Sequence, residues 1–114
     1  MADCLFCNIV AGAIPTEFIH EDKNGVAFYD IKPAAPVHIL VVPRDHIETV
    51  AELGADVNGV MSQLTGTANR IAQEIGLDSG GYRLIVNCGS DGGQTVFHLH
   101  MHLLGGHRMP ELAP

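Results

Sequence analysis

The sequence predicts an α+β domain in which an antiparallel sheet carries one long helix on one face, with short helices near the N-terminus. Two observations lead to this fold class. Short strand-like runs are joined by tight turns, which favours antiparallel pairing. One longer stretch keeps the spacing of an amphipathic helix. The 114 residues suit one domain over 1–114, without repeats or linkers.

The first half of the chain contains two expected strands. Residues 4–11 are expected to form a short helix or turn. Residues 25–30 predict a strand that ends in a proline-containing loop. Residues 37–42 are apolar apart from His38 and are bounded by prolines on both sides. They therefore predict a central strand that is covered on both faces.

Two further helices are expected in the middle of the chain. Asp45, followed three residues later by Glu48, resembles an N-cap pair that opens a short helix carrying His46. The long helix is expected from Val57, with Gly76 as its C-terminal cap. Its apolar positions keep helical spacing: Val60, Met61, Leu64, Ala68, Ile71, Ala72 and Ile75.

The last part of the chain predicts a third strand over 82–87, a turn over 89–93 and a fourth strand over 96–104. Side chains alternate between the two faces of a strand. One face of the fourth strand is therefore expected to enter the core: Leu99, Met101 and Leu103. The other face is expected to carry three imidazoles about 6–7 Å apart: His98, His100 and His102.

Two kinds of chemistry use such a row of histidines. One is a metal site, because neutral imidazole is a common zinc ligand and ligands two residues apart on a strand can share an ion. The other is covalent catalysis, in which one imidazole attacks an electrophile while its neighbours orient it and transfer protons. His38 favours the second, because a buried histidine needs a partner and can orient another histidine.

A glycine-rich segment over 87–95 precedes the histidines. Glycines let backbone N–H groups turn toward a ligand, and Gln94 and Thr95 add side-chain donors. Such a run by itself is more typical of a hairpin turn. Its position beside the histidine row favours a phosphate-binding loop.

Cys4-x-x-Cys7 has the spacing of a metal-binding pair, but no second pair follows it. A metal site would have to be assembled by the fold, with distant histidines such as His46 and His98. A redox pair and two unpaired buried cysteines are the alternatives. The total of three cysteines does not suit a secreted disulfide framework.

The charge balance disfavours some partners. Six basic and thirteen acidic side chains give a formal net charge of −7, and the basic residues do not cluster. This argues against nucleic-acid binding, although local donors can still hold a small anion. No basic segment leads into an apolar stretch at the N-terminus, and no apolar run approaches the ~18 residues of a membrane span. We expect a cytoplasmic protein without a membrane partner.

The sequence resembles the histidine-triad (HIT) superfamily, and most closely its Hint branch. The fourth strand matches the signature H-φ-H-φ-H-φ-φ, in which φ is apolar, at residues 98–104. Further similar blocks follow one another along nearly the whole chain: Phe6-Cys7-Asn8-Ile9, Ile14-Pro15, residues 28–33, residues 36–43, Val86-Asn87 and residues 89–96.

The resemblance implies a HIT-like fold, a homodimer, and hydrolysis of purine nucleoside 5′-phosphoramidates through a covalent nucleotidyl-histidine intermediate. His100 would be the nucleophile and His102 would contact the phosphate and the leaving group. His38 and His98 would be orienting histidines. Asp30 would accept the ribose hydroxyls, and Ile31 would lie beside the base. The resemblance also assigns phosphate-binding positions: Asn87, Gly93, Gln94, Thr95, His100 and His102.

Some members of the superfamily hold a structural zinc ion, and the matching positions here are Cys4, Cys7, His46 and His98. No organic cofactor is implied. Three alternative functions stay open: a dinucleoside polyphosphate hydrolase of the same superfamily, a nucleotide-binding regulatory module with little turnover, and a metalloenzyme that uses the histidine row as a catalytic zinc site.

Overall fold

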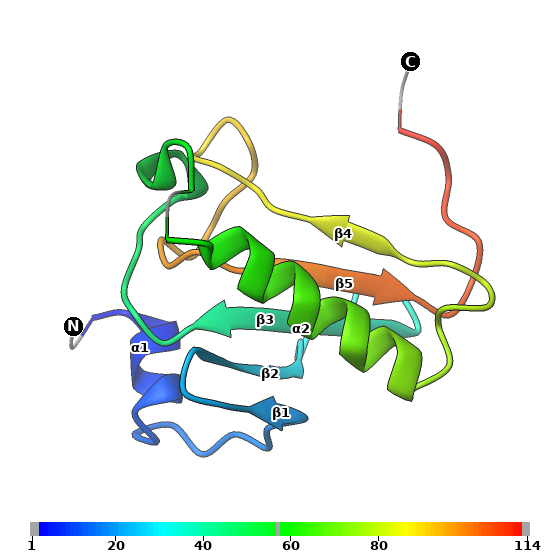
Figure 1. Cartoon of the computed structure of the whole chain (residues 1–114), viewed down its shortest axis with the longest axis horizontal. Coiled ribbons are helices and arrows are strands. Elements are labelled where there is room, and N and C mark those ends of the chain that lie inside the picture. Colours follow the sequence, from blue (N-terminus) through cyan, green and yellow to red (C-terminus); the bar gives the residue numbers. More distant parts are fainter. Residues whose placement is uncertain (1–2, 57, 113–114) are drawn as a thin grey trace.

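The computed structural model describes residues 3–56 and 58–112 and confirms the α+β class. In this part of the chain, five strands form one antiparallel sheet in the order β1-β2-β3-β5-β4, with helix α2 across one face (Figure 1). The strands are β1 His20–Glu21, β2 Gly25–Tyr29, β3 Val37–Pro43, β4 Arg83–Ile85 and β5 Met101–Gly105. The helices are α1 Leu5–Val10, the 3₁₀ helix η1 Val50–Leu53 and α2 Val60–Glu74.

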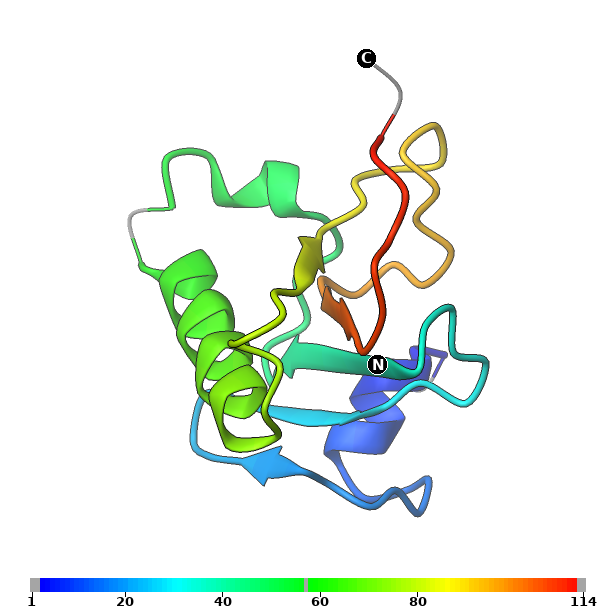
Figure 2. The same ribbon diagram turned by 90° about the vertical axis from the view of Figure 1, so that its right-hand side faces the viewer.

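Strand β3 lies at the centre of the sheet, and its alternating side chains enter two different cores. Ile39 and Val41 pack in the core under α2. Leu40 and Val42 pack on the other face against Phe6 of α1. Figure 2 shows α1 and α2 on opposite sides of the sheet. The strand is therefore covered on both faces, as its apolar sequence predicts.

Helix α2 has a defined cap at each end. The Asp56 carboxylate accepts hydrogen bonds from the N–H groups of Val60 (2.9 Å) and Met61 (3.0 Å) at the first turn. Gly76 follows the last turn with φ +84°, and the N–H of Leu77 donates to the Ala72 carbonyl (2.8 Å). Gly76 thus ends the helix as predicted, because a left-handed conformation favours glycine. Val57, where the helix was expected to begin, lies outside the described residues.

The short helix expected at Asp45 is wrong. The first helical residue after β3 is Val50, in η1, so His46 lies in a loop. Residues 46–48 are hydrogen-bonded to a segment far along the chain: the N–H of Leu99 donates to the Ile47 carbonyl. These long-range bonds replace the local bonds of a helix.

The same contacts explain why the last strand is shorter than expected. The prediction began it at Val96, whereas β5 begins at Met101 and residues 96–98 form a bend. Before β5, the Leu99 N–H and the Gln94 side chain donate to the carbonyls of Ile47 and Glu48, and this segment does not pair with β3. The third strand is also shorter than the predicted 82–87, because β4 spans Arg83–Ile85, and β2 ends one residue early, at Tyr29.

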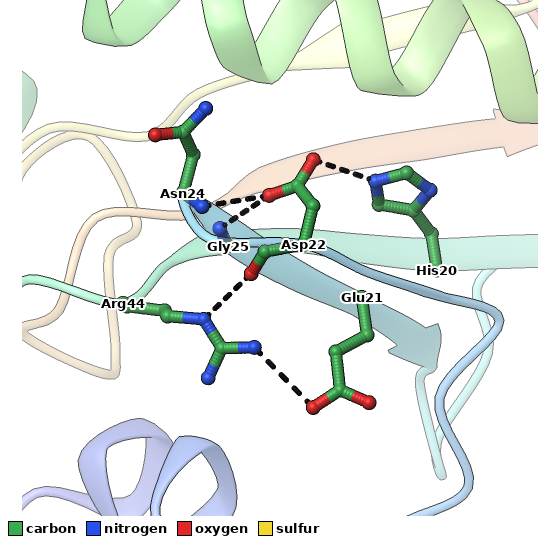
Figure 3. A network of polar contacts seen from close by, with 6 residues as sticks. All are labelled: His20, Glu21, Asp22, Asn24, Gly25 and Arg44. Atoms are coloured by element: carbon green, nitrogen blue, oxygen red, sulfur yellow. Dashed lines mark hydrogen bonds and ion pairs between the residues drawn. The ribbon is translucent and has the colours of Figure 1, made fainter.

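Strand β1 was not predicted, because two residues are too few to show alternation. Asp22 closes the turn between β1 and β2: its carboxylate accepts the N–H groups of Asn24 (2.8 Å) and Gly25 (2.9 Å) and contacts the His20 ring (2.8 Å; Figure 3). The His20 contact and these N–H groups outweigh burial and lower the pKa of Asp22 to about 2. Arg44 donates to the Asp22 carbonyl (2.7 Å) and so fastens the turn to the end of β3.

Across residues 3–56 and 58–112, no helix is long and apolar enough to cross a membrane.

Candidate active site and metal cluster

The three histidines lie on the side of the sheet away from α2, but their rings diverge. The residues between them lie in the core under α2, as predicted: Leu99, Met101 and Leu103. The His98 ring turns toward Cys4 and Cys7. The rings of His100 and His102 lie together, with centroids 5.0 Å apart. The three histidines of one sequence row therefore divide between two clusters, His98 with the cysteines and His100 with His102.

His100 is held in a single tautomer. Its Nδ1 donates a hydrogen bond to the main-chain carbonyl of His98 (2.8 Å). A carbonyl only accepts, so the proton of the neutral ring is on Nδ1 and Nε2 keeps its lone pair. Nε2 bonds to no described residue. Every buried side-chain nitrogen or oxygen of the described chain has a hydrogen-bond partner, so an atom without one, such as this Nε2, is not buried. The lone pair of His100 Nε2 is therefore accessible to a ligand.

His38 and His102 form a hydrogen-bonded chain that starts at the backbone. The N–H of Ala34 donates to His38 Nδ1 (3.0 Å), so the proton of neutral His38 is on Nε2. This Nε2 donates to His102 Nδ1 (2.9 Å). The proton of neutral His102 is then on its own Nε2. His102 thus offers an N–H donor beside the His100 lone pair.

The rings of His100 and His102 are both neutral at pH 7. Burial lowers the pKa of His100, against the opposing effects of the His98 carbonyl and Asp30. Burial, and then the neighbouring His100 and His38, lower the pKa of His102 to about 4. A neutral imidazole has the lone pair that a nucleophile or proton acceptor needs.

This pKa shift predicts a pH dependence of stability. Since the pKa of His102 is about 4 in the fold and about 6.5 when unfolded, the unfolded chain binds more protons between these values. The free energy of unfolding should therefore fall as the pH falls from about 6.5 to about 4. Urea titrations across this range should show a shallower pH slope for His102→Gln than for the original chain. Equal slopes would contradict the assignment.

Phe6 is a site residue that the sequence analysis did not single out. Its ring is 4% exposed and meets the His100 ring edge-on at a centroid distance of 4.9 Å. It also contacts the His98 ring at 5.9 Å. Helix α1 therefore supports the His100 ring, and the sequence signal for this was the Phe6-Cys7-Asn8-Ile9 block.

The glycine-rich segment forms a tight loop next to the histidines. The Asn87 side chain donates to the Gly92 carbonyl (2.8 Å), and Gly93 has φ +85°. The Gln94 side chain is buried and bonds only to backbone groups. Thr95 is exposed, and its N–H and hydroxyl have no partner among the described residues. Within this loop, Thr95 thus offers two unused donors, its N–H and its hydroxyl.

Asp30 and Ile31 lie where β2 runs into the proline-containing loop. One Asp30 oxygen accepts the N–H of Lys32 (2.8 Å), and the other lies 3.5 Å from His38 Nε2. Ile31 is 93% exposed. The exposed Ile31 side chain offers an apolar surface on which an aromatic ring can pack. The neighbouring Asp30 carboxylate can accept hydrogen bonds from hydroxyl groups.

The cysteine pair meets two histidines. The fold brings together Cys4, Cys7, His46 and His98, with one ligand atom of each within 4.8 Å of every other. Cys4 Sγ lies 3.3 Å from His98 Nδ1, and Cys7 Sγ lies 3.2 Å from His46 Nδ1. Both cysteines are free thiols in this structure.

The donor set fits zinc. Zn–S bonds of ~2.3 Å and Zn–N bonds of ~2.0 Å at tetrahedral angles separate S and N by about 3.5 Å. His98 Nε2 donates to the Pro43 carbonyl (2.8 Å), which leaves the Nδ1 lone pair facing the sulfur atoms. Burial and the neighbouring Cys4 raise the pKa of the Cys7 thiol, which favours its protonated form. A zinc ion bound here would displace this proton, because zinc binds thiolates.

A second group of possible ligands fits a metal less well. One ligand atom of each of Asp30, His38 and His102 also lies within 4.8 Å of the others. The N–H of Ala34 occupies His38 Nδ1, so the neutral ring carries its proton on Nε2, the atom that faces this group. A protonated nitrogen cannot ligate. The group therefore works as a hydrogen-bonded chain.

Comparison with known sequences gives one matching family model, described as "HIT domain", over residues 11–109. A purine nucleoside phosphoramidase of Escherichia coli is 40% identical over 104 residues, which cover 91% of this chain and 87% of that protein.

Solved structures agree with this comparison. A histidine triad protein from Clostridium difficile has a TM-score of 0.94 and 43% identity, covering 99% of this chain and 98% of that one. A HIT family hydrolase from Clostridium thermocellum has a TM-score of 0.93 and 43% identity, covering 98% and 97%. A Zn-bound histidine triad family protein from Mycobacterium smegmatis has a TM-score of 0.81 and 30% identity, covering 98% and 81%.

Proposed function

Because the chain belongs to the HIT family and is a hydrolase of that family, we propose that it hydrolyses the P–N bond of purine nucleoside 5′-phosphoramidates through a nucleotidyl-histidine intermediate. The observation that carries the proposal is the pair of fixed tautomers. His100 presents a bare Nε2, and its neighbour His102 presents an N–H. A nucleophile and a proton donor side by side are what cleavage of a P–N bond requires.

In the first step, His100 Nε2 attacks the α-phosphorus while the P–N bond breaks. The His100 ring becomes positively charged and keeps its Nδ1–H on the His98 carbonyl. The departing nitrogen takes a proton from His102 Nε2. This transfer needs one extra proton on the His38–His102 pair, which the anionic phosphate and the nearby Asp30 favour.

In the second step, water attacks the phosphorus and the P–Nε2 bond breaks. The neutral His38–His102 pair left by the first step accepts the proton of this water. His100 then leaves as a neutral ring, and the product is a nucleoside 5′-monophosphate. The same groups thus serve as acid first and base second.

The remaining predicted residues would bind the nucleotide. Asp30 would accept the ribose hydroxyls and Ile31 would pack on the base. The phosphate would lie on the loop that contains Asn87, Gly93, Gln94 and Thr95, where the free donors of Thr95 would stabilise the charge on its equatorial oxygens. The N–H groups of Gly93 and Gln94 and the Gln94 amide already bond within the protein and would shape this loop. The exposure of Ile31 and the unused donors of Thr95 support these roles.

The Cys4, Cys7, His46 and His98 cluster would hold a structural zinc ion. A closed four-ligand site contributes folding energy and leaves no open position for a reacting group. In this assignment His98 orients His100 through its carbonyl, while its ring is a ligand.

We further propose that the protein is a cytoplasmic homodimer. Strand β4 is an edge of the sheet, and in the described part of the chain no backbone hydrogen bond joins its outer side to another segment, so it can pair with a second copy. The opposite edge strand β1 has two residues. Sedimentation equilibrium should give twice the chain mass of 12.2 kDa. A mass of one chain at micromolar concentration would contradict the dimer.

A single-turnover assay tests the proposed activity. The purified protein is mixed with an adenosine 5′-phosphoramidate that carries a fluorescent amine, and release of the amine is followed with and without a chelator. Turnover that persists with the chelator supports the histidine mechanism over a catalytic zinc site. Nucleotide binding without turnover would instead indicate a binding module.

A further inference from the structure

Gln94 has a buried side chain whose amide makes three hydrogen bonds to the backbone. The residue is 5% exposed. Its Oε1 accepts the N–H of Gly89 (2.9 Å). Its Nε2 donates to the carbonyls of Glu48 (2.7 Å) and Val96 (3.0 Å). Both Nε2 hydrogens are used, so the side chain has no donor left for a ligand.

These bonds hold the backbone on both sides of Thr95. Before it, the Gln94 N–H donates to the Gly89 carbonyl (3.0 Å), and the Gln94 side chain accepts from the Gly89 N–H. After it, the Val96 carbonyl is held by the Gln94 amide. Thr95 itself is exposed, with an N–H and a hydroxyl that bond to no described residue. Two free donors therefore sit on a clamped backbone.

The third bond anchors this clamp to a different part of the fold. Glu48 lies in the segment that follows β3 and contains His46 of the metal cluster. The adjacent Ile47 carbonyl accepts the Leu99 N–H just before His100. The loop is thus fixed relative to the nucleophile, and not only within itself.

We propose that Gln94 is a positioning residue for the phosphate: its amide sets the backbone so that the N–H and hydroxyl of Thr95 point at the phosphate attacked by His100. Gln94 does not touch the ligand through its side chain. This inference rests on the proposed function, because it requires a nucleotide phosphate at this loop.

Three variants of the full-length protein test the role of the Gln94 amide. Gln94→Glu keeps the shape and one acceptor but loses both donors, so its carboxylate faces the Glu48 and Val96 carbonyls. Gln94→Met keeps the volume without any of the three bonds. Gln73→Glu makes the same chemical change at an exposed position of α2 and serves as the control.

Calorimetric dissociation constants for AMP and for adenosine separate positioning from general folding. We expect Gln94→Glu and Gln94→Met to weaken AMP binding at pH 7.5 by about tenfold or more. This is the size expected when the Thr95 donors lose their hydrogen bonds to the charged phosphate. Adenosine, which lacks the phosphate, should bind within about twofold of the original chain. Gln73→Glu should change neither constant.

Acidification gives a second readout of the Gln94 amide. In Gln94→Glu, protonation of the introduced carboxylate restores one O–H donor toward the Glu48 carbonyl. The ratio of the Gln94→Glu constant for AMP to that of the original chain should therefore shrink between pH 7.5 and 5.5. The side chain introduced by Gln94→Met cannot be protonated, so the ratio for that variant should stay constant.

Several outcomes would overturn the inference. Unchanged AMP binding in Gln94→Met would show that the amide does not matter for the phosphate, and equal losses of AMP and adenosine would show a general folding defect. If Gln94→Glu does not fold, Gln94→Met decides alone. Failure of the original chain to bind AMP or adenosine would instead refute the proposed function, and the positioning role with it.

Discussion

Replacement of His100 by alanine is expected to abolish phosphoramidate hydrolysis, with a loss in single-turnover rate on the order of 10⁴-fold or more. The reason is the loss of the ring whose Nε2 lone pair is free and fixed toward the site. Its neighbours cannot replace it, because His102 carries its proton on Nε2 and His38 uses both nitrogens in hydrogen bonds. Without the covalent intermediate, water would have to attack an intact phosphoramidate.

Binding should survive this substitution. Apart from His100 itself, the candidate groups for the base, ribose and phosphate stay in place, so AMP should bind to His100→Ala within about tenfold of the original affinity. Quenched reactions of the original chain should contain a nucleotide covalently attached to the protein, and those of the variant should not.

His20→Ala is the matched control, because His20 lies in β1 at the far edge of the sheet and contacts Asp22. Its turnover should be close to that of the original chain. Hydrolysis by His100→Ala within about tenfold of the original rate, in a preparation free of host enzyme, would refute the covalent mechanism.

The sequence could predict most of the fold because its patterns are local. The apolar run of β3, the helical spacing of α2 and the alternation of Leu99, Met101 and Leu103 each report the burial of one element. Gly76 reports the left-handed residue that ends α2. Patterns of this kind are short in range and depend on secondary structure alone.

What the sequence could not predict depends on contacts between distant segments. Residues 46–48 were expected to be helical, and residues 96–100 were expected to belong to a strand. The two segments instead bond to each other, because the Leu99 N–H donates to the Ile47 carbonyl and the Gln94 side chain donates to the Glu48 carbonyl. Strand alternation alone would have put all three imidazoles in one row. The bend at 96–98 is what sends the His98 ring to the cysteines.

The role of Gln94 was out of reach for a related reason. A glutamine between a glycine-rich turn and a histidine row is expected to donate to a phosphate. Only the structure shows that its donors are used by the Glu48 and Val96 carbonyls. The position of a polar residue in a motif indicates its neighbourhood but not which neighbour it bonds.

Loss of the metal cluster should have the largest effect on stability. Cys4 and Cys7 lie at helix α1, His46 follows β3 and His98 precedes β5, so one ion would join three segments that are otherwise far apart in the chain. Chelation, or Cys7→Ser, should lower the Tm by roughly 10–20 °C, corresponding to a few kcal/mol for a domain of this size.

Activity should change less than stability. His100 and His102 are fixed by the His98 carbonyl and by His38, which are not ligand atoms. The rate per folded molecule, measured well below the Tm of the variant, should therefore stay within about tenfold of the original. A larger loss in a fully folded sample would mean that the cluster takes part in the chemistry.

Cys88→Ser provides the control, since Cys88 is an exposed free cysteine outside the cluster. This variant should keep both the Tm and the metal content of the original protein. Elemental analysis should find about one zinc ion per chain in the original and in Cys88→Ser, and less in Cys7→Ser. A protein without bound metal whose Tm does not respond to chelation would mean that the four side chains pack as an ordinary polar cluster.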